Sequence, residues 1–188
     1  YHKEGHPTMT KEFVQVTFNQ AMFDLMRPLM LTLPFIEDFR VWKGEQSLSL
    51  DRIREISSPL PFGDIRRWYG YAYPDMQVDI AESLPFDFDP ELETLMAKEF
   101  DEAIVVNRTS RYRNPQISYA FLNRIEQPIF FVGSLDEYDD FQQWVPRAVY
   151  RPVEDFKELA MIIGACRLFI GNQSFCFALA EAMKTPRL

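Results

Sequence analysis

Apolar residues in the second half of the chain fall into four short continuous runs, separated by segments with helical character. The runs cover residues 103–107, 128–132, 148–150 and 168–170. Helices are predicted between them over 115–125 and 156–166, and a helix or a loop over 136–144. A last helix is predicted over 174–184, followed by Pro186 and a new strand. Strands without in–out alternation are typical of a parallel sheet covered by helices on both faces. The pattern therefore predicts an α/β fold with a Rossmann-like parallel sheet.

The first half of the chain has a weaker pattern. Three-and-four spacing predicts a helix over 20–33, capped by Asn19 and kinked at Pro28. A second helix is predicted over 65–73, and short strands over 12–18, 39–42 and 76–83. Two prolines and several acids over 84–100 indicate a boundary, with a short helix over 91–98. We therefore divide the chain into 1–90, a linker at 91–100, and 101–188.

Composition removes several classes of function. The net charge of −8 disfavours a nucleic-acid binder, which is usually basic. Two cysteines are too few for a disulfide scaffold, so Cys166 and Cys176 are expected to be buried free thiols. No apolar run reaches the roughly 18 residues of a membrane span. The only histidines are His2 and His6, and no cluster has metal-ligand spacing, so no metal and no cofactor is expected.

The turn after the first predicted strand carries the clearest candidate chemistry. It contains Arg108, Thr109, Arg111 and Arg113. Guanidinium groups and small hydroxyls suit a diphosphate, whereas the alternative is a basic loop in solvent. Three arginines within six residues repel one another unless an anion is present. This repulsion favours a diphosphate site.

The turns after the second and fourth strands should lie at the same edge of the sheet. Gly133 stands in one, with an ordinary strand-ending turn as the alternative, and Gly171, Asn172 and Ser174 stand in the other. Gly171 permits a backbone conformation that other residues resist, and Ser174 is predicted to cap the following helix. A helix that begins there offers N–H groups and a positive dipole end to an anion.

The acidic residues have less specific interpretations. Glu181 lies two helical turns beyond Ser174, about 10 Å along the helix. It is predicted to contact a ribose, with an ion pair to Arg108 or a structural ion pair as alternatives. Asp155 is expected to cap the helix over 156–166. The acids at positions 136, 137, 139 and 140 are expected to form a solvated face.

Several of these segments resemble one family. Residues 104–114 (IVVNRTSRYRN), 130–133 (FFVG), 169–175 (FIGNQSF) and 180–182 (AEA) are similar to the C-terminal half of glycosyltransferase family 9-like enzymes, the ADP-heptose:lipopolysaccharide heptosyltransferases. The resemblance implies a GT-B-type fold. Residues 1–90 would be a partial acceptor-side domain, and residues 101–188 a nucleotide-sugar-binding domain truncated at its C-terminus. The family turn reads Asp-Ser/Thr-Gly followed by His, whereas residues 172–175 here read NQSF.

The resemblance implies transfer of a sugar from a nucleotide-diphosphate donor to a bacterial surface glycan such as lipopolysaccharide or capsule. The implied partners are a nucleotide-sugar donor and a glycan or glycolipid acceptor, with a cytoplasmic location and a peripheral contact with the inner membrane. No catalytic residue is assigned, because the chain reads as a piece of a longer polypeptide that would supply the rest. The alternatives are a nucleotide-sugar epimerase of the same architecture and a non-catalytic nucleotide- or glycan-binding module.

Overall fold

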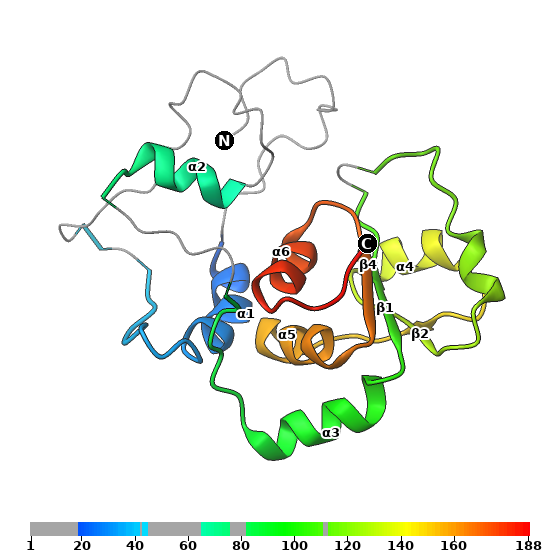
Figure 1. The fold of residues 1–188 in the computed structure, drawn as a ribbon, viewed down its shortest axis with the longest axis horizontal. Coiled ribbons are helices and arrows are strands. Elements are labelled where there is room, and N and C mark those ends of the chain that lie inside the picture. The colour runs from blue at the N-terminus through cyan, green and yellow to red at the C-terminus, as the bar shows by residue number, and fades with distance from the viewer. Residues whose placement is uncertain (1–18, 42, 45–64, 76–81, 111–112) are drawn as a thin grey trace. The chain divides into compact units, whose positions relative to one another are not determined.

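The computed structural model describes residues 19–41, 43–44, 65–75, 82–110 and 113–188 (Figure 1). Its elements, in chain order, are α1 (Gln20–Met30), α2 (Ile65–Ala72), α3 (Pro90–Phe100), β1 (Ile104–Asn107), the 3₁₀ helix η3 (Ala120–Arg124), β2 (Ile129–Phe131), α4 (Leu135–Gln142), β3 (Val149–Tyr150), α5 (Phe156–Ala165), β4 (Leu168–Gly171) and α6 (Phe175–Ala182). The four strands of the described residues follow residue 100, where the four continuous apolar runs predict them.

The described residues form two compact units. One contains the described parts of Tyr1–Arg40 together with Leu84–Leu188, and the other contains those of Val41–Ser83. Helix α2 belongs to the second unit and confirms the helix predicted over 65–73. The strand predicted over 39–42 is wrong at its described residues, 39–41, which are irregular. The strand predicted over 12–18, and that over 76–83 up to residue 81, lie outside the described residues. The division at 91–100 stays a prediction.

The sheet is parallel throughout, with strand order β3-β2-β1-β4. Strand β1 lies between β2 and β4, and Asn107 at its end is in register with Gly171 at the end of β4. The other edge of β4 pairs with the end of the chain, where Phe169 N–H donates to the Pro186 carbonyl at 2.9 Å and Leu188 N–H to the Phe169 carbonyl at 3.0 Å. This pairing confirms the change to extended chain predicted after Pro186.

Helices cover both faces of the sheet, which explains why its strands do not alternate between apolar and polar residues. Val105 and Phe169 point into one core cluster, shared with α3, α5 and α6. Ile104 and Val106 point into the other, shared with η3 and α4. Figure 1 shows α5 and α6 on one side of β1 and β4, and α4 on the other. Helix α1 also packs against α5. The sheet is therefore a buried platform whose strand ends carry the polar loops.

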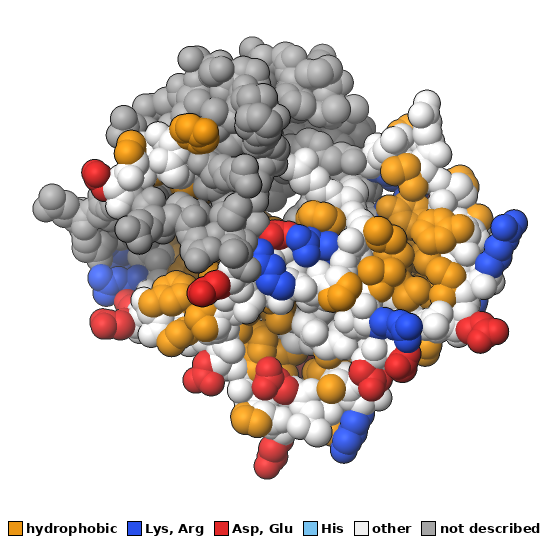
Figure 2. Space-filling view, in the orientation of Figure 1, with side chains coloured by type: hydrophobic (Ala, Val, Ile, Leu, Met, Phe, Trp, Pro, Cys, Tyr) orange, Lys and Arg blue, Asp and Glu red, His pale blue; other side chains and the backbone are white. Residues whose placement is uncertain are grey.

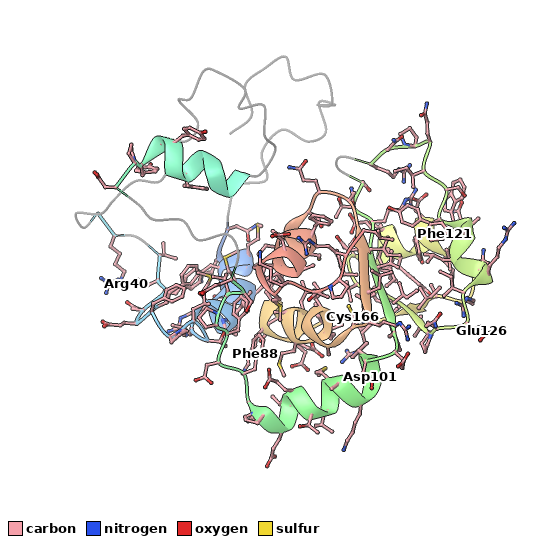
Figure 3. The ribbon with its side chains drawn as sticks, viewed as in Figure 1. Arg40, Phe88, Asp101, Phe121, Glu126 and Cys166 are labelled. Carbon is pink, nitrogen blue, oxygen red and sulfur yellow. The ribbon has the colours of Figure 1, made fainter. Side chains whose placement is uncertain are left out.

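The caps and the cysteines agree with the sequence. Asn19 caps α1, and Asp155 caps α5, as predicted. Helix α1 ends two residues beyond Pro28, and residues 91–100 lie in α3. The thiols of Cys166, which follows α5 (Figure 3), and of Cys176 in α6 are free and buried. Burial raises the pKa of each to about 12, so both remain protonated at neutral pH. No helix among the described residues is long and apolar enough to cross a membrane.

The helix predicted over 115–125 is wrong, because only Ala120–Arg124 is helical, and as a 3₁₀ turn. Side chains before it take over the backbone hydrogen bonds: Asn114 Oδ1 accepts from Gln116 N–H at 2.9 Å, and Ser118 Oγ from Ala120 N–H at 3.3 Å. Such local bonds compete with a regular helix. Ile117 and Phe121 consequently stay exposed. Figure 2 shows hydrophobic side chains gathered over this part of the surface, where Figure 3 labels Phe121.

Candidate functional site

The carboxyl ends of β1 and β4 bring two predicted turns together. From β1 the chain passes to β2 and β3 on one side, and it returns through α5 to β4 on the other. The order of the strands therefore reverses between β1 and β4, and ligands of open α/β sheets bind outside such a reversal point. Arg108 follows β1 and Ser174 follows β4, so both lie at this edge, as the sequence predicts. We call the loops after β1 and β4 the switch loops.

Asn107 joins three elements beneath the switch loops. Its side chain is 2% exposed. Its Nδ2 donates to the Val132 carbonyl after β2 at 2.7 Å, and its Oδ1 accepts from Ser174 Oγ at 2.9 Å. The same hydroxyl accepts from Phe177 N–H at 3.3 Å and so caps α6, as predicted. Asn107 was not among the predicted site residues, although a polar residue at the end of an apolar strand is a signal that the sequence contains.

Asn172 and Thr109 connect the two switch loops directly. Thr109 N–H donates to Asn172 Oδ1 at 2.9 Å, and Asn172 Nδ2 donates to the Thr109 carbonyl at 3.0 Å. The side-chain amide thus pairs with both backbone groups of Thr109, as a neighbouring strand would. The Thr109 hydroxyl also lies 3.0 Å from Asn172 Nδ2. These contacts fix the position of two predicted site residues relative to each other.

The two described arginines of the first switch loop share one internal counter-ion. Arg108 is 6% exposed and donates to Asp140 of α4, while Arg113 donates to the same carboxylate oxygen at 2.5 Å. Although burial acts in the opposite direction, Arg108 and Arg113 hold the pKa of Asp140 below its ordinary value. The Arg108 guanidinium also lies 5.7 Å from the centre of the Tyr119 ring. Arg111 lies outside the described residues.

Glu137 and Asp140 correct the expectation that the acidic run is only a solvated face. Glu137 forms a capping box with Ser134 at the start of α4. Its Oε1 also accepts from Ser110 N–H of the first switch loop at 3.2 Å. Helix α4 therefore faces the loop with two carboxylates, three residues apart. Neither carboxylate was among the predicted site residues, because their partners lie 27 and 32 residues away in the sequence.

The two predicted glycines occupy positions of close approach. Gly133 has a φ of +150°, and a Cβ there would lie 3.0 Å from Glu137 Oε2 and 3.1 Å from Asn107 Nδ2. A Cβ at Gly171 would lie 2.8 Å from the Phe169 ring and 3.0 Å from the Asn107 carbonyl. A Cβ at Gly171 would press on the backbone at the end of β1, so the packing of this edge favours glycine there. At Gly133 the positive φ itself favours glycine.

Glu181 does not pair with Arg108, and that alternative is wrong. Its carboxylate accepts from Lys184 Nζ at 2.9 Å and pairs with Arg187. These ion pairs join the end of α6 to the extended chain beside β4. The reason is distance: Arg108 is held by Asp140 at the opposite side of β1. A ribose contact of Glu181 stays a prediction. Among the described residues, no group of three or more His, Cys, Asp or Glu side chains could hold a metal ion.

Comparisons with known proteins find a similar fold at low sequence identity. No protein-family model and no curated protein sequence matches the chain. One similar solved structure is the glycosyl transferase family 9 protein from Veillonella parvula DSM 2008, with 19% identity, a TM-score of 0.49, and coverage of 64% of this chain and 41% of that one. Another is ADP-heptose LPS heptosyltransferase II of E. coli, with 15% identity, a TM-score of 0.45, and coverage of 65% and 46%. The matched part thus spans less than half of either structure.

Proposed function

We propose that the protein acts as a GT-B-type glycosyltransferase, which transfers a sugar from a nucleoside-diphosphate sugar to a glycan. Residues 101–188 are proposed to bind this sugar donor. The observation that carries this proposal is the hydrogen-bonded junction of the two switch loops at the reversal point between β1 and β4. That junction holds hydroxyl groups and the N-terminus of α6 at one position of the sheet edge. The N–H groups at the start of α6 are the kind of donors that phosphate oxygens accept from.

The predicted site residues would then have two kinds of role. Thr109, Ser174, Arg111 and Arg113 are proposed to contact the diphosphate. Buried or closely packed residues are proposed to shape the loops around it: Arg108, Gly133, Gly171 and Asn172. Glu181 is proposed to reach the ribose while keeping its ion pairs.

The proposed chemistry is mainly electrostatic. As the sugar leaves, the diphosphate gains negative charge, and donors already held in place stabilise that charge without reorganising. The proposed donor carries a hexosyl or heptosyl group, and the proposed acceptor is a bacterial surface glycan such as lipopolysaccharide or capsule. The enzyme is proposed to be cytoplasmic, with a peripheral contact to the inner membrane. No residue of the chain is proposed as the catalytic base.

Calorimetry with UDP, ADP, GDP and uridine tests donor binding. Ser174→Ala should weaken diphosphate binding about tenfold, because it removes the two hydrogen bonds that hold the start of α6 against Asn107, each contributing about 0.5–1.5 kcal/mol. Nucleoside binding should change little. Ser118→Ala is the matched control, since Ser118 Oγ also accepts a backbone N–H but lies in the loop before η3.

Two results would count against the proposal. If Ser174→Ala lost uridine affinity and UDP affinity equally, the diphosphate would not bind at the position of Ser174. If the protein bound none of the nucleotides tested, the donor-site proposal would be wrong. A third measurement, hydrolysis or transfer of a bound nucleotide sugar by the full-length protein, distinguishes the enzyme from a non-catalytic binding module.

A further inference from the structure

The Glu137 carboxylate lies at the centre of the polar edge. Its Oε1 accepts from Ser110 N–H at 3.2 Å, and its Oε2 accepts from Ser134 N–H at 3.3 Å. These N–H groups belong to different loops, one after β1 and one after β2. A carboxylate that accepts from backbone N–H groups of two strand-end loops occupies the position that a bound anion takes in such sheets.

Two further observations place the same carboxylate close to the other parts of the edge. A Cβ on Gly133 would lie 3.0 Å from Glu137 Oε2 and 3.1 Å from Asn107 Nδ2, so the carboxylate lies over the end of β2 and next to that of β1. Besides burial, the charge of Glu137 contributes to the raised pKa of Cys176 in the first turn of α6. The negative charge therefore also acts on the helix that follows β4.

Glu137 differs from its neighbour Asp140 in how firmly it is held. Asp140 binds two arginines, one of them 6% exposed, through a single oxygen. Glu137 instead accepts two backbone N–H groups at 3.2 and 3.3 Å, longer than the roughly 2.7–2.9 Å typical of strong charge-assisted bonds. Its capping box lies at the exposed start of α4. Of the two carboxylates, Glu137 is the one that a ligand could displace.

The first switch loop also contains a cationic N–H donor, Arg108 Nε, that makes no hydrogen bond to the described residues. This nitrogen is buried. Arg108 and Arg113 share the single charge of Asp140, so without Glu137 the described charges beside this loop are two positive and one negative. An anion that replaced Glu137 beside Ser110 would meet this excess positive charge.

We propose that Glu137 determines the anion selectivity of this edge by holding, through its own carboxylate, the N–H donors that a phosphate group would take. A diphosphate then binds only when Glu137 moves aside, and the negative charge of Glu137 disfavours anions that leave it in place. This inference rests on the proposed donor site, and it adds a specificity-determining residue that the sequence analysis assigned to solvent.

Glu137→Gln tests the inference without removing the cap, because glutamine also serves in a capping box. Inorganic pyrophosphate and UDP are titrated by calorimetry into the wild-type protein and the variant. Removal of one negative charge should tighten pyrophosphate binding about fivefold, the effect of one nearby unit charge in water. Uridine affinity should not change. Amide resonances of Ser110 and Ser134 should shift on adding pyrophosphate in both proteins, at lower concentration in the variant.

Glu158→Gln is the matched control. Glu158 accepts Glu154 N–H at 2.7 Å near the start of α5 and pairs with Arg151, so it resembles Glu137 in its place on the helix but accepts no N–H group of the switch loops. Its substitution should leave pyrophosphate affinity unchanged.

The outcomes separate this inference from the donor proposal. If Glu137→Gln gains pyrophosphate affinity while no nucleotide binds, the inference holds and the donor proposal fails. If nucleotides bind and Glu137→Gln leaves pyrophosphate and UDP affinities unchanged or weaker, the inference is overturned and the donor proposal survives. Equal gains in Glu137→Gln and Glu158→Gln would show a general charge effect and would also overturn it.

Discussion

The two sides of the β1 carboxyl end are built from different interactions. Toward β4, Asn107, Thr109, Asn172 and Ser174 form neutral hydrogen bonds of 2.9–3.0 Å. Toward β2, Arg108 and Arg113 form ion pairs with Asp140, and Glu137 accepts backbone N–H groups. The neutral side keeps a fixed geometry without carrying charge of its own. On the charged side, carboxylates of α4 already balance the positive charge of the arginines. An incoming anion therefore has to take the place of a carboxylate there.

This difference changes how the basic loop is understood. The repulsion among Arg108, Arg111 and Arg113 calls for an anion, and at the sequence level that anion was expected to be a ligand. The structure supplies an internal one, Asp140, from a helix 32 residues away. Positive charge at a strand end is therefore insufficient evidence for a phosphate site. The neutral junction between β1 and β4 is the stronger evidence, because its bonds hold the two loops in place without a ligand.

The largest effect is expected on the charged side. Asp140→Ala would leave the buried Arg108 guanidinium without its counter-ion and release Arg113. We expect a loss of about 2–3 kcal/mol in the free energy of unfolding, less than for a fully buried pair, because Asp140 is 41% exposed. Urea denaturation measures it. Asp139→Ala, an exposed acid of the same helix, is the control and should change stability by less than about 0.5 kcal/mol. Equal losses in both variants would show that Asp140 does not support Arg108.

A smaller effect is expected on the neutral side. Asn172→Asp removes the Nδ2 donor and places a carboxylate against the Thr109 carbonyl, so we expect a loss of about 1–2 kcal/mol. Diphosphate affinity should fall as well, because the switch loops separate and a negative charge enters. Asn123→Asp is the matched control, since Asn123 Nδ2 also donates to a backbone carbonyl, that of Trp144, far from this edge. An unchanged melting temperature and UDP affinity in Asn172→Asp would contradict the fixed junction.

The sheet could be predicted from the sequence because its strands are continuous apolar runs. All four strands predicted after residue 100 are present with small shifts of their ends, and Asp155 and Ser174 cap the predicted helices. The helix predicted over 115–125 is wrong, because Asn114 and Ser118 form local turns that the helical spacing of the segment does not reveal. The fold class was thus set by hydrophobic pattern, and the failure came from side chains that compete with the backbone.

The site could be predicted only in part. Parallel strands guarantee that Thr109, Asn172 and Ser174 share one edge, and this much follows from topology. Which side chains pair does not follow, because Glu137 and Asp140 lie on α4 and contact a loop 27–32 residues earlier. Their charges suggested solvent exposure, whereas the structure uses them as counter-ion and cap. Pairings over such separations depend on the packing of α4 against the sheet, which the local pattern leaves open.

The smallest expected effect is a pH dependence confined to the charged side. The pKa of Asp140 in the folded protein lies below its ordinary value of 3.8, because its ion pairs with Arg108 and Arg113 outweigh the effect of burial. A lowered pKa in the folded state means that the ion pairs stabilise the protein fully above about pH 4 and that this contribution is lost as pH falls through the lowered pKa. The difference in free energy of unfolding between wild type and Asp140→Asn should therefore be constant from pH 5 to 7 and shrink toward pH 3. Urea titrations at each pH measure this difference, and Asp139→Asn should show no such trend relative to wild type. A constant difference for Asp140→Asn across the whole range would mean that the ionised Asp140 is not what holds the two arginines, and the contrast between the charged and the neutral side would then rest on Glu137 alone.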